Sequence, residues 1–172
     1  MQTRQLLMIA FAIAITFTQE QVLVFLPNIQ FTVLLVFVFA SVFSLKEMTI
    51  YIIGYVLIDS LYMGGFNLFY MVPLMINWLM IAYIYHALFK DSDNLYLKAI
   101  LAFAFGFVYG WMFIPFHMLQ TGINQFWPYL LADLPYEIIM ATTGFLTVLW
   151  GYEPLVKVLR ISFNSPYPVH VK

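Results

Sequence analysis

Residues 97–119 read LKAILAFAFGFVYGWMFIPFHML, and Lys98 carries the only charge in this stretch. A helix crosses the hydrocarbon layer of a membrane with about 20 mostly apolar residues. Strands of a transmembrane barrel instead alternate between apolar and polar residues over roughly ten positions, whereas this stretch is apolar on every face. The stretch therefore predicts an all-α integral membrane protein.

The composition of the whole chain leads to the same fold class. The chain has 172 residues, of which 64% are hydrophobic and 9% are charged, and its mean hydropathy is +0.92. Soluble domains carry about 25% charged residues, and a domain of this size cannot bury so much apolar surface without lipid. A net charge of −1 without a basic stripe argues against nucleic-acid binding. Since there is no cysteine, disulfides and thiolate metal sites are excluded.

Apolar runs bounded by polar or turn residues predict six membrane-spanning helices in one membrane domain, residues 1–172. Their expected bounds are about 5–25, 29–45, 48–63, 67–89, 97–119 and 128–159. Gly64-Gly65 is a turn signal after the third run, and Pro135 and Pro154 are expected to break or bend the sixth. The first run resembles a signal peptide, but its small residues lie inside the run, so we interpret it as a retained span.

The basic residues indicate how this six-helix bundle is oriented. They are Arg4, Lys46, Lys90, Lys98, Lys157, Arg160 and Lys172. Arg4 precedes the first run, Lys46 separates the second from the third, Lys90 and Lys98 flank the loop between the fourth and the fifth, and the others end the chain. Positive charge in short loops marks the cytoplasmic face, so we expect both termini in the cytoplasm.

The opposite, outer half carries acidic and aromatic residues. Glu20, Asp59, Asp133 and Glu137 fall in or near it without a Lys or Arg to pair with, and ionisable groups at membrane depth usually face a cavity or a partner. A pocket for a ring-bearing solute needs aromatic walls and a few placed polar groups. The candidate substrate-binding residues are Asn28, Gln30, Asn67, Tyr70, Asn77, Trp78, Tyr109, His117, Asp133, Tyr136 and Glu137. The alternative interpretation is an interfacial aromatic belt with helix caps.

Small residues at four-residue spacing form two ladders, which let helix backbones approach closely. For Ala102-Gly106-Gly110 in the fifth run we expect packing within the chain. Ala10 and Ala14 in the first run are candidates for docking a partner helix, with packing inside the chain as the alternative.

No catalytic site, metal or cofactor is expected. His86, His117 and His170 are scattered, and the sequence has no nucleophile motif or phosphate-binding loop. An intramembrane hydrolase would need a residue constellation that this chain lacks. We therefore do not expect the chain to be an enzyme.

Four features occur in a characteristic order. They are the step Ala10-x-x-x-Ala14, the stretch FLPNIQFTVLLVFVFAS at 25–41, a short third run ending in Gly64-Gly65, and PYLLADLPYEIIMATTGFLTVLWGYEPLVKVL at 128–159. Together, over residues 4–160, they resemble the substrate-binding (S) components of energy-coupling factor (ECF) vitamin importers.

The resemblance implies a fold, partners and a location. The fold is a six-helix bundle with both termini in the cytoplasm and an outward pocket closed by the loops after the first, third and fifth helices. A transmembrane T subunit with two ATPase subunits docks on the S component, here through Ala10 and Ala14, in the plasma membrane of a bacterium. Some relatives carry an arginine where this chain has Glu20 and Gln21, so no particular relative's substrate transfers to it.

The expected substrate is a water-soluble vitamin. Folate and pantothenate are anionic and usually need a cation, which the outer half is not expected to supply, although a helix N-terminus can bind a carboxylate. A neutral corrinoid, or a neutral or cationic ring such as pyridoxine or hydroxymethylpyrimidine, suits an acidic and aromatic pocket better. Cobalamin is our first expectation.

A structural role is the alternative function. MreD-like cell-shape scaffolds have similar length and number of spans and need no outward pocket. They usually present a Leu-Asp pair early in the chain, of which Ile58-Asp59 is a faint counterpart. Tight binding of a vitamin would distinguish an S component from such a scaffold.

Overall fold

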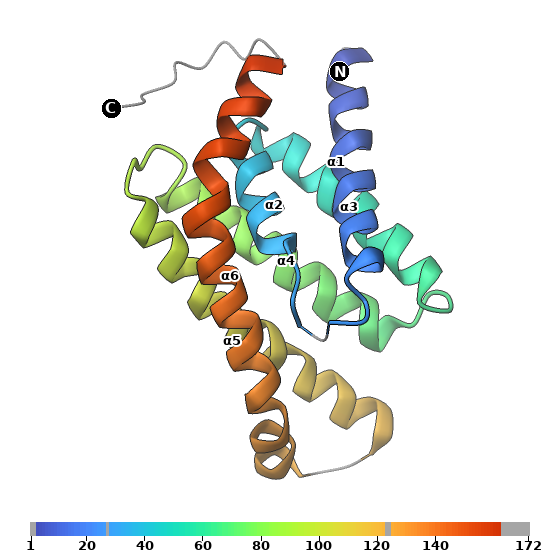
Figure 1. Ribbon diagram of the computed structural model, residues 1–172. Helices are drawn as coiled ribbons and strands as arrows, with labels where there is room; N and C mark the ends of the chain where they lie inside the picture. The colour runs from blue at the N-terminus through green and yellow to red at the C-terminus, as the bar shows by residue number, and fades with distance from the viewer. Residues whose placement is uncertain (1–2, 27, 123–124, 163–172) are drawn as a thin grey trace.

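The computed structural model describes residues 3–26, 28–122 and 125–162, and within these ranges the chain forms helices and no strand. The helices are α1 (Thr3–Val22), α2 (Thr32–Ala40), α3 (Leu45–Tyr62), α4 (Leu68–Leu88), α5 (Leu95–Thr121) and α6 (Phe126–Ser162). The start of α1 and the end of α6 lie at the same end of the bundle, as do the α2–α3 junction and the α4–α5 connection (Figure 1). The predicted all-helical fold class is confirmed for the described residues.

Among the described helices, α1, α4 and α5 are long and apolar enough to cross a membrane. Large apolar side chains on their outer surfaces remain exposed, for example Leu7 on α1 and Ile100 and Leu119 on α5. Soluble proteins rarely expose large contiguous apolar patches, because water solvates them poorly. Helices of this length and surface are characteristic of α-helical membrane proteins.

The helix in the second predicted span is much shorter than residues 29–45. α2 has nine residues, all of them buried. At 1.5 Å per residue it is about 14 Å long, compared with roughly 30 Å for the hydrocarbon core of a bilayer. Because it is apolar on every face, it packs against α1, α3, α4 and α6 together and occupies the centre of the bundle.

Local signals set the helix ends on either side of α3. Ser44 and Glu47 form a capping box, in which Ser44 Oγ accepts from the Glu47 amide at 3.3 Å and a Glu47 carboxylate oxygen accepts from the Ser44 amide at 2.7 Å. After α3, Gly64 and Gly65 have φ values of +108° and +111°, a region in which a side chain would be strained. The predicted turn at these glycines is therefore confirmed.

α5 and α6 pack along each other and extend beyond the other helices as a hairpin (Figure 1). A Cβ atom added to Gly106 would lie 2.5 Å from the Cα atom of Ala141, so the two backbones touch there. The small residues of α5 thus pack within the chain, as expected. α6 is continuous through Pro135 and Pro154, so the predicted break is absent. A membrane helix tolerates proline where its neighbours satisfy the freed carbonyl groups.

Candidate functional site

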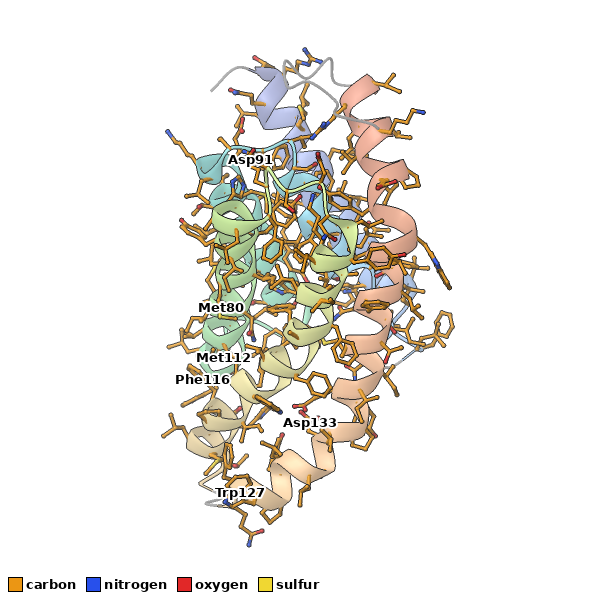
Figure 2. The ribbon with its side chains drawn as sticks, turned by 90° about the vertical axis from the view of Figure 1, so that its left-hand side faces the viewer. Met80, Asp91, Met112, Phe116, Trp127 and Asp133 are labelled. Atoms are coloured by element: carbon orange, nitrogen blue, oxygen red, sulfur yellow. The ribbon has the colours of Figure 1, made fainter. Side chains whose placement is uncertain are left out.

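The charged side chains divide between the two ends of the bundle. The described Lys and Arg residues lie near the start of α1, the start of α3, the α4–α5 connection and the end of α6, all at one end (Figure 1). Glu20 is near the end of α1, Asp59 near the end of α3, and Asp133 and Glu137 near the start of α6. Figure 2 shows Asp91 toward the basic end and Asp133 toward the other. These four acids therefore lie away from the described basic residues.

Glu20 is held by hydroxyl groups from two other helices. Thr32 Oγ1, at the start of α2, donates to Glu20 Oε1 at 2.5 Å, and Tyr55 OH, on α3, donates to Glu20 Oε2 at 2.6 Å. Gln19 fixes the same region, because its Nε2 donates to Thr32 Oγ1 at 2.7 Å and its Oε1 accepts from the Phe31 amide at 2.9 Å. Both carboxylate oxygens of Glu20 thus have donors without any basic residue.

A second buried carboxylate lies in the same half of the bundle. Asp59 is only 4% exposed, and its Oδ2 accepts from Tyr70 OH, on α4, at 2.7 Å. The carboxyl groups of Glu20 and Asp59 are near enough to interact electrostatically. We call Glu20, Thr32, Tyr55, Asp59 and Tyr70 the acid–hydroxyl cluster. It joins the ends of α1 and α3 to the starts of α2 and α4.

Aromatic rings border this cluster. Trp78 is fully buried, and its ring lies 6.3 Å from that of Tyr55 and 5.5 Å from that of Tyr109, measured between centroids. The ring of Phe113 continues the contact, 5.2 Å from Tyr109 and 5.9 Å from Tyr70. Tyr55, Tyr70, Trp78, Tyr109 and Phe113 form what we call the aromatic wall. It adds α5 to the helices around the two acids.

Two buried polar atoms of the wall region, Asn77 Oδ1 and Trp78 Nε1, have no hydrogen-bond partner among the described residues, and the same holds for Ser60 Oγ on α3 and Glu137 Oε1 on α6. Asn77 uses its Nδ2 to donate to the Tyr109 carbonyl at 3.2 Å, and Glu137 uses its Oε2 to accept from Trp111 Nε1 at 2.9 Å. Leaving a buried polar atom unpaired costs about 1–3 kcal/mol. A bound solute would form hydrogen bonds with such atoms, so they are candidate contacts of a binding site.

The structure brings some predicted binding residues together. Tyr70 belongs to the acid–hydroxyl cluster, and Asn77, Trp78 and Tyr109 lie at the aromatic wall that borders it. Gln30 reaches toward α6, where its Nε2 lies 3.8 Å from Met140 Sδ. Gln30 is partly buried and lies two residues before the start of α2.

Glu137 is 3% exposed and lies against Gly110 of α5, one turn of α6 from Met140. His117 stacks on Tyr129 at 5.9 Å between ring centroids and interacts electrostatically with Asp133. These residues belong to the α5–α6 hairpin. They form a second polar group, which the ring of Phe113 links to the wall through its contact with His117.

Three predicted binding residues are not placed with the others. Asn67 is exposed and caps α4, where its Oδ1 accepts from the Phe69 amide at 3.0 Å, so the helix-cap interpretation fits it. Tyr136 is 49% exposed on α6. Asn28, with φ of +60°, belongs to the connection between α1 and α2.

The two candidate docking residues lie on the outer surface of α1. Ala10 and Ala14 are exposed, whereas Ile9, Ala12 and Thr16 of the same helix are buried against the bundle. Ala10 and Ala14 therefore face away from the rest of the described chain. Packing within the chain, the alternative interpretation, does not describe them.

Sequence reasoning missed part of the cluster. Glu20 and Asp59 were recognised as unpaired acids but not assigned to the binding site, and Thr32 and Tyr55 were not considered. A signal was available, since Tyr51, Tyr55 and Asp59 are spaced by four residues and so share one face of α3. Within the described ranges no three His, Asp or Glu residues are grouped as a metal site would require.

Comparisons of this chain with models of known protein families, with curated proteins and with solved structures gave no match.

Proposed function

We propose that this chain is the substrate-binding (S) component of an ECF-type importer, and that it takes up a water-soluble vitamin across a bacterial plasma membrane. The observation that carries the proposal is the acid–hydroxyl cluster beside the aromatic wall. Two buried carboxylates, a set of rings and unpartnered polar atoms converge in one half of a helical membrane protein. Pockets for small solutes combine apolar and aromatic walls with a few polar groups in this way.

The energetics of the cluster favour ligand binding over a purely structural role. Carboxylates buried away from water are unfavourable unless a positive charge compensates them. A scaffold such as an MreD-like protein would gain more from apolar residues at these positions. A binding protein instead needs polar groups for which the solute supplies the missing partner.

The orientation follows from the charges. With the basic end in the cytoplasm, all six helices cross the membrane and both termini lie inside. The acid–hydroxyl cluster then lies in the outer half, where a solute arrives. α2 crosses as the short central element, continued on either side by the non-helical residues around it.

The proposed partners are a transmembrane T subunit and two ATPase subunits. The described residues contain no nucleotide-binding motif, so the free energy for uptake comes from these partners. The exposed face of α1 around Ala10 and Ala14 is the proposed docking surface, because small side chains allow a partner helix to approach closely.

The test separates binding from coupling. The full chain, purified in detergent, is first titrated calorimetrically with water-soluble vitamins, cobalamin included, and the vitamin that binds becomes the probe. Cells that express the chain with a T subunit and ATPases should take up this probe. Replacing both Ala10 and Ala14 with Trp should abolish uptake, since bulky side chains keep the partner helix away, while the purified variant binds the probe with unchanged affinity.

A matched control carries two Trp residues on another exposed surface, at Ile100 and Phe103 of α5. Uptake by this control should continue. Equal uptake by both double variants would remove the support for docking through α1. A folded chain that binds none of the vitamins would contradict the proposed function itself.

A further inference from the structure

We infer that the solute bound beside the acid–hydroxyl cluster is an organic cation with an aromatic ring and N–H donors. The inference rests on the proposed function and narrows the vitamin class to cationic rings. It is based on the hydrogen-bond acceptors, the charges and the aromatic rings of the site.

The hydroxyl groups of the cluster have already donated their protons. The hydroxyl protons of Thr32 and Tyr55 are used on Glu20, and that of Tyr70 is used on Asp59. A hydroxyl that has donated its single proton can only accept further hydrogen bonds. The cluster therefore offers a ligand carboxylate oxygens and hydroxyl lone pairs, all of them acceptors.

Two buried polar atoms at the aromatic wall have no partner among the described residues: Asn77 Oδ1, an acceptor, and Trp78 Nε1, a donor. Together with the carboxylate and hydroxyl oxygens of the cluster, this set contains more acceptors than donors, so a ligand that satisfies it must bring donors of its own. Ring nitrogens with attached hydrogens and amino groups provide them.

Among the described residues, the two acids of the cluster have no basic residue near them. Glu20 and Asp59 interact electrostatically and have hydroxyl partners, while the described Lys and Arg residues belong to segments at the other end of the bundle (Figure 1). Even the buried Lys98 is committed there, because its Nζ donates to Tyr152 OH at 3.0 Å. A positive charge on the ligand would compensate both carboxylates, whereas a negative charge would add repulsion.

Aromatic rings lie next to the two acids. Trp78, Tyr55 and Tyr109 present a continuous set of aromatic faces and edges next to the acids. Indole and phenol rings attract cations through their quadrupoles and stack on flat aromatic solutes. Acids and rings together select a flat cation over a flat neutral molecule.

The test uses the full chain in detergent and ligands that differ in charge. Thiamine and pyridoxamine are the cationic probes. Pyridoxine, riboflavin, nicotinamide and cyanocobalamin are neutral, and biotin, pantothenate, folate and nicotinate are anionic. We expect the tightest calorimetric binding with a cation, and pyridoxamine should bind more tightly than pyridoxine, which differs from it by a hydroxyl in place of the ammonium group.

Variants that remove charge but keep shape complete the test. Glu20→Gln and Asp59→Asn should each weaken binding of the cation roughly tenfold or more, because a hydrogen bond to a charged group becomes a neutral one. Glu153→Gln, at an exposed acid near the basic end of α6, is the matched control and should bind like the wild type. Size-exclusion profiles and unfolding midpoints identify any variant that fails to fold.

The outcomes separate the two proposals. If the tightest ligand is neutral or anionic, or if Glu20→Gln and Asp59→Asn bind the cation as well as Glu153→Gln does, the inference is wrong while the proposed function stands. A folded wild-type chain that binds no member of the panel overturns both.

Discussion

Lys98 lies in the first turn of α5 with 5% of its surface exposed, although it is a charged residue of a membrane protein. Its Nζ donates to Tyr152 OH at 3.0 Å and lies 4.5 Å from the centre of the Tyr152 ring, and the hydroxyl groups of Tyr152 and Tyr85 are hydrogen-bonded to each other. Phenol oxygens and ring faces therefore compensate this ammonium group, since they can stabilise a cation in place of a carboxylate.

Removing one hydroxyl tests this account. Tyr152→Phe keeps the ring over Lys98 but deprives its ammonium of an acceptor, so we expect the free energy of unfolding to fall by about 1–3 kcal/mol. Thermal unfolding of the purified protein in detergent measures the effect as a lower midpoint. Tyr83→Phe is the control, because Tyr83 is 44% exposed and its hydroxyl bonds to Thr49 at the surface; it should change stability by about 0.5 kcal/mol or less. Equal midpoints for the two variants would show that the rings alone stabilise Lys98.

The sequence allows the acids to be predicted but not their partners. Glu20 and Asp59 could be recognised because a charge at membrane depth is unfavourable in any fold. Tyr55 could not be assigned to Glu20, since the two residues are 35 positions apart and only the packing of α1 on α3 brings them together. For Asn67 the sequence left two interpretations open, and its hydrogen bond to the Phe69 amide fits the helix cap.

At the scale of helices, the pair α5–α6 depends on the absence of side chains. A Cβ atom at Gly106 would lie 2.5 Å from both the Cα and the amide nitrogen of Ala141, and backbone atoms cannot move aside without displacing α6. The close contact is therefore a property of the two helices rather than of one residue.

Gly106→Ala should push α5 and α6 apart and lower the free energy of unfolding by about 1–3 kcal/mol, the usual effect of overpacking. Gly54→Ala in α3 is the matched control. Its added Cβ would meet only the flexible end of Ile13, at 2.6 Å from Cδ1, so a small rotation relieves the contact. Unfolding midpoints in detergent compare the two, and a variant at Gly106 as stable as the one at Gly54 would mean that the helices are not in close backbone contact.

Element lengths show what hydropathy can and cannot predict. The apolar run through Leu45 predicted a full span, yet α2 ends at Ala40. Ser41 Oγ donates to the Val38 carbonyl at 2.7 Å, and Ser44 already caps α3. Two serine side chains barely change the hydropathy averaged over a window, although their hydrogen bonds decide where a helix ends. Pro135 and Pro154 were expected to break or bend the last helix. α6 is not broken there, because neighbouring groups can satisfy the carbonyl groups that a proline leaves free.

At the scale of the whole molecule, charge is distributed between two ends. The described basic residues gather where α1 begins and α6 ends, and Glu20, Asp59, Asp133 and Glu137 lie in the other half. A membrane potential and the translocation machinery retain basic segments on the cytoplasmic side. The orientation of the chain thus decides whether the acid–hydroxyl cluster receives solutes from outside or from the cytoplasm.

Single cysteines test the orientation directly, because the chain has none of its own. Gln125→Cys lies beside the α5–α6 turn and Asp93→Cys lies in the α4–α5 connection, and both positions are exposed. In intact cells an impermeant maleimide should label Gln125→Cys, whereas Asp93→Cys should react only after the membrane is permeabilised, because the α4–α5 connection, which Lys90 and Lys98 flank, stays in the cytoplasm. Labelling of Asp93→Cys alone in intact cells would invert the orientation and place the cluster on the cytoplasmic side, where an importer could not collect its substrate. Labelling of both would mean that α5, which separates the two positions, does not cross the membrane.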